Sequence, residues 1–324
     1  MSARPKVLLT RRWTEEAQQR LASRFDVTLN ENDRPMDAAA LATAVREYDA
    51  ICPTVTDAIT ASILETAGRR VKLIGNFGVG YNHIDVATAQ RLGIRVSNTP
   101  DVLTDTTADL AILLMLMATR RAGEGERELR GGKWIGWRPT HLMGLGLQER
   151  TLGLIGYGRI AQATARRAHL GFGMRIVYNS RRRVTPQIEA ECNATYVEAV
   201  DELLAGSDVV SLHCPGGAET HHLIDARRLR LMKPTAVLVN TARGTVVDEA
   251  ALAQALASGQ IAAAGLDVYE REPVVHPGLL ALENVVLLPH LGSATRETRT
   301  AMGMRVADNL EAFFDGRPLR DPVV

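Results

Sequence analysis

The stretch Gly153-Leu-Ile-Gly156-Tyr-Gly158-Arg-Ile-Ala161 decides the fold of the second half of this chain. An apolar strand pattern leads into Gly156 and a helical pattern begins after Gly158, so the glycines lie on a tight strand-to-helix turn. Gly156 allows the turn, Gly158 allows a pyrophosphate to approach the backbone, and Ala161 allows close packing of helix on strand. Backbone N–H groups at the helix start bind the phosphates. The stretch therefore predicts a dinucleotide-binding domain.

The choice of dinucleotide is indicated by the segment Asn179-Ser-Arg-Arg-Arg183, about two dozen residues after the turn. Domains of this kind carry an acidic residue there, which binds the ribose hydroxyl of NAD. This chain has Ser180, Arg181 and Arg182 instead, and guanidinium groups bind a 2′-phosphate that a carboxylate would repel. We therefore predict that these three residues bind NADP, with NADPH preferred and NAD also possible. The alternative is that the arginine run is only a solvated face.

Length and composition narrow the class of protein. A chain of 324 residues, 46% hydrophobic and 23% charged, is expected to form two domains. The net charge of +1 offers no global field for nucleic acid or a membrane. The three cysteines are too far apart to suggest a disulfide framework or a metal site. The longest apolar run, Leu110–Ala118, is far shorter than the roughly 20 residues that cross a bilayer. We expect a cytoplasmic protein without metal.

Short apolar runs alternate with helical patterns along the whole chain, which predicts parallel sheets with helices on both faces. Helices are expected at Met36–Val45, Ile59–Ala67, Arg159–His169 and Arg296–Phe314. Expected strands of a first series are Lys6–Thr10, Phe25–Leu29, Ala50–Cys52, Leu73–Asn76 and Ile94–Ser97. Those of a second series are Thr151–Ile155, Arg175–Asn179, Asp208–His213, Ala236–Asn240, Ala262–Leu266 and Val285–Leu288. The first series lacks a glycine fingerprint, so it is not expected to bind the nucleotide.

Two segments connect the series. Asp101–Arg121 is expected to form a long helix, buried on all sides because its centre is continuously apolar. Residues 122–150 contain many glycines together with Trp134 and Trp137, and they are expected to form a long loop at an interface.

The chain resembles the D-isomer-specific 2-hydroxyacid dehydrogenases over essentially its whole length, and within them the glyoxylate/hydroxypyruvate reductases. Gly132-Lys-Trp-Ile-Gly-Trp-Arg-Pro139 and the arginines after Ser180 point to that subgroup. The resemblance to the family rests on the Gly156 turn and on ordered motifs, namely Asn76-Phe-Gly-Val-Gly-Tyr-Asn-His-Ile-Asp85, Thr104-Asp-Thr-Thr-Ala-Asp109, Leu212-His-Cys-Pro215, Val239-Asn-Thr-Ala-Arg-Gly244, Gly265-Leu-Asp-Val-Tyr-Glu-Arg-Glu-Pro273 and Leu288-Pro-His-Leu-Gly-Ser293.

The resemblance implies a two-domain homodimer with a cleft between the domains of each chain. A Rossmann-type NADP domain would span 101–290, and a flavodoxin-like substrate domain would span 1–100, completed by 291–324. Such an enzyme would reduce a small 2-keto acid, glyoxylate to glycolate or hydroxypyruvate to D-glycerate. Trp137 is expected to reach the partner's active site and limit substrate size, or else to be an ordinary interface or core residue.

Residue chemistry points to three catalytic positions, which match the family's catalytic arginine, glutamate and histidine. Arg243 follows a strand, where its planar fork suits a carboxylate and the neighbouring carbonyl. His290 also follows a strand, and imidazole exchanges protons near neutral pH. Glu272 pairs with that imidazole and orients it. Glu270 is the nearby alternative, but the Glu-Pro pattern selects Glu272.

The other site residues follow from the family pattern. For the substrate carboxylate they are the backbone amides of Val79 and Gly80, since glycines leave N–H groups open to an anion. Ser293 is expected to contact substrate or His290, and Asp267 to meet the nicotinamide carboxamide. The remaining expected cofactor contacts are Thr107, Gly156, Gly158, Arg159, Ile160, Ala161, Pro215, Thr220, Thr241, Ala242, Arg243 and His290.

Two other functions share most of these features. One is a dehydrogenase of other 2-keto acids, of phosphoglycerate or of phosphonate, which would lack only the tryptophan-bearing loop and the arginines. The other is a non-catalytic NAD(P)-sensing regulator like the family's transcriptional corepressor branch. The absence of an interaction tail or a basic patch argues against it.

Overall fold

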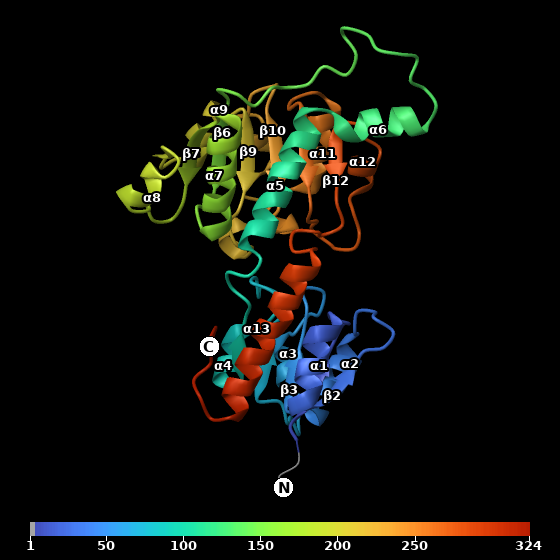
Figure 1. The fold of residues 1–324 in the computed structure, drawn as a ribbon, viewed down its shortest axis with the longest axis vertical. Coiled ribbons are helices and arrows are strands. Elements are labelled where there is room, and N and C mark those ends of the chain that lie inside the picture. Colours follow the sequence, from blue (N-terminus) through green and yellow to red (C-terminus); the bar gives the residue numbers. More distant parts are fainter. Residues whose placement is uncertain (1–3) are drawn as a thin grey trace. The chain divides into compact units, whose positions relative to one another are not determined.

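The computed structural model describes residues 4–324 and divides into two units, each built on a parallel sheet (Figure 1). One unit holds the described residues up to Leu103 together with Ala294–Val324, and the other holds Thr104–Ser293. The sequence placed these boundaries at 100/101 and 290/291, a few residues earlier.

The first unit has five parallel strands in the order β2-β1-β3-β4-β5, the flavodoxin-like order. Apolar residues cover both faces of the sheet, because α1 and α13 pack on one face and α2, α3 and α4 on the other. The elements are β1 (Lys6–Leu9), α1 (Glu15–Arg24), β2 (Asp26–Leu29), α2 (Ala38–Glu47), β3 (Ala50–Cys52), α3 (Ala61–Leu64), β4 (Leu73–Gly75), α4 (Val86–Arg91), β5 (Arg95–Ser97) and α13 (Arg296–Phe314).

The second unit has seven parallel strands in the order β12-β11-β10-β9-β6-β7-β8, the doubly wound order of nucleotide-binding domains. Helices α5 and α7 cover one face, while α9, α10 and α11 cover the other. The strands are β6 (Thr151–Ile155), β7 (Arg175–Asn179), β8 (Thr195–Tyr196), β9 (Val209–Leu212), β10 (Val237–Asn240), β11 (Ala263–Leu266) and β12 (Val285–Leu287). The helices are α5 (Thr104–Thr119), α6 (Ala122–Arg130), α7 (Arg159–Phe172), α8 (Pro186–Ala190), α9 (Val200–Gly206), α10 (Ala226–Leu229), α11 (Glu249–Ala257) and α12 (Pro277–Leu280), with short 3-10 turns η1 (Ala218–Thr220) and η2 (Gly244–Val246).

Two expectations about the connecting segments are wrong. Residues 122–130 are the helix α6 rather than loop, because charged residues outnumber the two glycines there and an ion pair joins Arg121 to Glu124. Helix α5 is not buried on all sides, since Leu113 is 44% exposed. Asp109 and Asp105 lie on the same outward stripe, one and two turns earlier, and pair with Arg167. The apolar run therefore faces the sheet on one side only.

The expected helix Ile59–Ala67 is reduced to the single turn α3, because Ile59 forms a β-bridge with Ile84 and the chain turns after Leu64, with Gly68 at φ of 74°. In the part of the chain that the structure describes, every helix is too short or too polar to cross a membrane.

Candidate active site

The three expected catalytic residues follow three neighbouring strands of the second unit. Arg243 comes after β10, Glu272 after β11 and His290 after β12, and these strands are adjacent in the sheet. Because all strands are parallel, their carboxyl ends meet at one edge of the sheet, where open α/β sheets bind ligands. The glycine turn after β6 lies at the same edge.

His290 and Glu272 form a direct pair. The Nδ1 of His290 lies 2.8 Å from the Oε2 of Glu272, and the other carboxylate oxygen accepts a hydrogen bond from the backbone N–H of Tyr269 at 3.1 Å. Burial would raise the pKa of Glu272, but the bond with His290, the charges of His290 and Arg243 and the bond from Tyr269 outweigh it and hold this pKa below its ordinary value. A carboxylate therefore faces the imidazole at neutral pH.

The nearby Glu270 has a different role. Its Oε1 accepts the backbone N–H of Glu249 at 2.8 Å, and the carboxylate of Glu249 accepts the N–H of Glu270 in return. The Nε2 of His222 lies 3.2 Å from the same Oε1. Glu270 thus ties its loop to the start of α11, and the selection of Glu272 as the partner of His290 is consistent with this geometry.

Asp267 holds the loop that carries His290. Its two carboxylate oxygens accept the backbone N–H groups of Leu291 at 2.6 Å and Gly292 at 2.8 Å. His290 has φ of 53°, in the left-handed region that costs energy for residues other than glycine, and its own N–H donates to the carbonyl of Asp267. Burial raises the pKa of Asp267 to about 6 against the opposing effect of these bonds. Thr107 supports the same loop by donating to the carbonyl of Gly292 at 3.1 Å.

Arg243 is held between strand ends. Asn240 donates to the carbonyl of Arg243 at 2.9 Å and accepts the N–H of Ala242 at 3.0 Å. Burial lowers the pKa of the Arg243 guanidinium, while the charge of Glu272 opposes that shift. Neighbouring Gly216 leaves room for the arginine, because an added Cβ there would lie 2.9 Å from its Cγ.

The glycine turn has the geometry that the sequence predicts. Gly156 has φ of 85°, and an added Cβ would lie 2.6 Å from the backbone nitrogen of Cys214. Gly158 is the N-cap of α7, with no side chain capping the first turn, and an added Cβ there would meet no described atom within 4 Å. Ala161 is fully buried against the sheet. The first-turn N–H groups thus suit a phosphate.

The arginine segment after β7 divides into paired and exposed side chains. Arg183 forms two 2.8 Å hydrogen bonds with Glu189, which with the bond from Tyr178 lower the pKa of Glu189 to about 2. The side chain of Arg181 is 84% exposed, and its nearest carboxylate is that of Glu219, at 3.9 Å. Ser180 donates its hydroxyl to the carbonyl of Arg182 at 2.6 Å, so it stabilises the turn and keeps only its oxygen available as an acceptor.

Several other expected cofactor contacts lie along this edge. The hydroxyl of Thr220 donates to the carbonyl of Pro215 at 2.7 Å, which closes a turn after β9. The buried hydroxyl of Thr241, after β10, has no hydrogen-bond partner among the described residues, as expected of a group that awaits a ligand. Arg159 and Ile160 begin α7, directly after Gly158. These positions fit a dinucleotide laid across the carboxyl ends of β6, β9 and β10.

The residues expected to bind the substrate carboxylate belong to the first unit. Val79 and Gly80 lie in the loop between β4 and α4, and their backbone N–H groups donate to no other group among the described residues. Ser293 is the last residue of the second unit and is half-buried. Trp137 is 82% exposed in the segment after α6.

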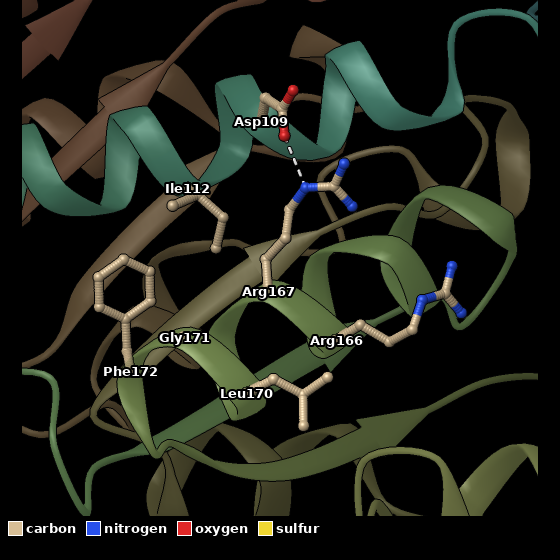
Figure 2. Close-up of a pocket in the computed structure, with 7 residues that line it drawn as sticks. All are labelled: Asp109, Ile112, Arg166, Arg167, Leu170, Gly171 and Phe172. Carbon is tan, nitrogen blue, oxygen red and sulfur yellow. Dashed lines mark hydrogen bonds and ion pairs between the residues drawn. The ribbon is translucent and has the colours of Figure 1, made fainter.

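A hollow of the second unit lies elsewhere (Figure 2). It is a groove of about 510 Å³ between α5 and α7, where Arg167 joins Asp109 by a 2.6 Å hydrogen bond and the apolar side chain of Leu170 is 74% exposed. This groove lies on the helical face of the sheet and not at the strand ends, so it is not the catalytic site.

Comparison with known proteins gives matches along the whole chain. The family model for the NAD-binding domain of D-isomer-specific 2-hydroxyacid dehydrogenases matches residues 112–292. The glyoxylate reductase of Thermococcus onnurineus is 46% identical, covering 97% of this chain and 94% of that enzyme. The NADPH-dependent glyoxylate/hydroxypyruvate reductase of Sinorhizobium meliloti, solved with NADP and malonate, has a TM-score of 0.88 at 38% identity and covers 99% of this chain and 97% of that one. The D-mandelate dehydrogenase of Rhodotorula graminis has a TM-score of 0.87 at 30% identity, covering 99% and 98%.

Proposed function

This chain belongs to the D-isomer-specific 2-hydroxyacid dehydrogenase family, and on that premise we propose that it reduces glyoxylate and hydroxypyruvate with NADPH as the preferred hydride donor. It is an NAD(P)-dependent oxidoreductase of 2-hydroxyacids. The choice of small substrates is supported by the 46% identity to a glyoxylate reductase over nearly the whole chain. The main support for the proposed reaction is the pairing of His290 with Glu272, at the edge of the sheet that also holds Arg243.

Each catalytic residue has a defined task in this proposal. The nicotinamide, when bound, supplies the hydride to the keto carbon. The Arg243 guanidinium binds the substrate carboxylate and polarises the carbonyl as negative charge develops on its oxygen. His290 donates the proton that turns this oxygen into the product hydroxyl, and Glu272 stabilises and orients the donating imidazolium. In the reverse direction the same imidazole accepts the proton.

The preference for NADPH rests on Arg181. It is exposed, is close to a single carboxylate among the described residues, and follows β7 at the position where an acidic residue would select NAD. We include Ser180 and Arg182 in the phosphate site, with Ser180 contributing through its turn. Glu219 opposes the preference, because its carboxylate competes with a phosphate for Arg181.

The substrate carboxylate is also assigned to the backbone amides of Val79 and Gly80, and Ser293 to a contact with substrate or His290. We further propose a homodimer formed through the second unit. Leu170 is apolar and exposed at the groove between α5 and α7, Leu113 on α5 is 44% exposed, and Ile135 and Trp137 are about 80% exposed. Exposed apolar groups gathered on one unit favour burial against a second copy.

The dimer proposal has its own test. Sedimentation should give twice the mass of the 35.2 kDa chain. If Trp137 reaches the partner's site, Trp137→Ala should improve turnover of bulky keto acids relative to glyoxylate. Equal effects on small and bulky substrates would remove Trp137 from the site.

The decisive experiment for the function is oxidation of NADPH and NADH by the purified protein over a panel of keto acids. Glyoxylate and hydroxypyruvate with NADPH should give the highest kcat/KM. A clear preference for phenylglyoxylate would favour a substrate range like that of the D-mandelate dehydrogenase with a similar structure. A clear preference for NADH would overturn the cofactor assignment.

A further inference from the structure

Every carbonyl group of the segment Gly78-Val79-Gly80 is held by an asparagine side chain of the same unit. The Nδ2 of Asn76 donates to the carbonyl oxygens of Gly78 at 2.9 Å and Gly80 at 3.0 Å. The Nδ2 of Asn98 donates to the carbonyl oxygen of Val79 at 2.8 Å. Asn76 follows β4 and Asn98 follows β5, so the ends of two adjacent strands supply the two amides.

These bonds also determine where the N–H groups of the loop point. In a planar trans peptide the carbonyl of one residue is opposite to the N–H of the next, and the peptide bonds of this loop are trans. The bond from Asn98 to Val79 therefore orients the N–H of Gly80. The bond from Asn76 to Gly78 orients the N–H of Val79 in the same way, assisted by the N–H of Thr99, which donates to the same carbonyl at 3.1 Å.

Asn76 is itself oriented by a histidine. It is completely buried, and its Oδ1 lies 2.9 Å from the Nε2 of His83. Since the Nδ2 of Asn76 serves two carbonyls, Oδ1 must accept, and His83 must carry a hydrogen on Nε2. The amide therefore has no alternative orientation that satisfies its partners.

We propose that Asn76 and Asn98 are positioning residues for recognition of the substrate's carboxylate, which they achieve by aiming the N–H groups of Val79 and Gly80 at it. This inference rests on the proposed function, which assigns the carboxylate to these two amides. Donors that are already oriented need no rearrangement when the anion binds, so their full interaction contributes to binding. The sequence singled out the glycines of this loop, whereas the tertiary structure shows what holds them.

The test compares Asn76→Ala and Asn98→Ala with the matched control Asn30→Ala. Asn30 also holds two backbone carbonyls of the first unit, those of Thr10 at 2.8 Å and Arg34 at 2.7 Å, but in another loop. Two quantities are measured: the Kd of oxamate, an unreactive keto-acid analogue, for the enzyme saturated with NADPH, and the KM for glyoxylate. Loss of one neutral hydrogen bond predicts a rise of about 3- to 10-fold in both quantities for Asn98→Ala. Asn76→Ala loses its bonds to two carbonyls, so it should raise both at least as much.

The control should bind oxamate like the wild type even if its melting temperature falls, and the KM for NADPH should be unchanged in all three variants. Asn98 is half-buried whereas Asn76 is buried, so Asn98→Ala can still be measured if Asn76→Ala does not fold. Asn98→Asp, which has the same shape but loses the donor, should weaken oxamate binding further. Unchanged oxamate binding in Asn98→Ala, or an equal loss in Asn30→Ala, would overturn the inference.

The oxamate measurement also separates this inference from the proposed function. Suppose that the wild type binds oxamate, that the asparagine variants bind it more weakly, and that the wild type reduces neither glyoxylate nor hydroxypyruvate. The substrate assignment then fails and the positioning role stands. If the wild type reduces these acids and the variants bind oxamate normally, the positioning role fails and the substrate assignment stands. If the wild type binds no oxamate, both fail.

Discussion

The Nδ1 of His290 lies 2.8 Å from the Oε2 of Glu272, although the two residues belong to loops after different strands. This pairing engages one ring nitrogen, so in the proposed reaction Nε2 is the nitrogen left to exchange a proton with the substrate. Substitutions in this pair, in the loop that Asp267 holds and in the nucleotide turn should separate their contributions to catalysis and to cofactor binding.

Replacing His290 by glutamine should remove the proton donor and leave a neutral side chain. Positioned acid–base groups typically contribute about 10²- to 10⁴-fold, so the kcat for glyoxylate should fall by that factor with little change in the KM for NADPH. His169→Gln is the control, since that imidazole, in the last turn of α7, bonds the carbonyl of Met174. Near-normal turnover of His290→Gln would remove His290 from the reaction.

Asp267 predicts an acid limb in the rate of reduction. Its pKa is raised to about 6, so it is ionised at pH 7 and gains a proton as the pH falls through 6. The protonated form loses an acceptor for the N–H of Leu291 or Gly292, and the loop that carries His290 loosens. We expect kcat to fall as the pH is lowered from about 7 to 5, even though a lower pH by itself favours the protonated form of a proton donor.

Asp267→Asn should lower kcat at every pH and abolish this limb, because an amide cannot accept both N–H groups. Asp248→Asn is the control, because Asp248 caps α11 and its carboxylate lies 4.0 Å from His222 rather than against the loop of His290. The same pKa has a consequence for stability. A carboxyl whose folded pKa lies above its unfolded value of 3.8 destabilises the fold increasingly as the pH rises from about 4 to 6, and denaturant titrations across that range measure it. An acid limb that persists in Asp267→Asn would assign it to another group.

Arg181→Ala should weaken the use of NADPH and barely affect NADH. Losing a charged hydrogen-bond partner costs about 1.5–3 kcal/mol, which corresponds to about 10- to 150-fold in kcat/KM. Arg183→Ala is a matched control from the same segment, because that side chain is engaged by Glu189. If both variants lose NADPH equally, the effect comes from the loop as a whole and not from Arg181.

The two glycines of the nucleotide turn should fail in different ways. Gly156→Ala forces a side chain into a left-handed conformation and against the backbone of Cys214, so the melting temperature should fall together with cofactor binding. Gly158→Ala meets no described atom, so the protein should stay folded while its affinity for NADPH falls. Thermal unfolding with and without NADPH distinguishes them. Full NADPH affinity in Gly158→Ala would place the pyrophosphate elsewhere.

Much of the fold could be predicted because its signals are local. The period of the apolar runs and the turn at Gly156 indicated two parallel-sheet units, and the strand at Ala50–Cys52 and the helix at Arg296–Phe314 have the predicted bounds. The ordered motifs around Arg243, Glu272 and His290 identified the family, which the comparisons confirm. Local patterns failed at 122–130, where glycines suggested a loop and favourable side-chain pairs made a helix.

By itself, the sequence determined the family, the strand-end positions of Arg243, Glu272 and His290, and the glycines that the nucleotide turn requires, because each depends on residue type and local spacing. Only the tertiary structure decided which side chains are already engaged. It paired Arg183 with Glu189 and left Arg181 exposed, it placed Asp267 behind His290, and it brought Asn76 and Asn98 to the carbonyls of one loop. Those pairings join residues that the chain separates, and hydrogen bonds depend on position and direction in space, which spacing along a sequence does not encode.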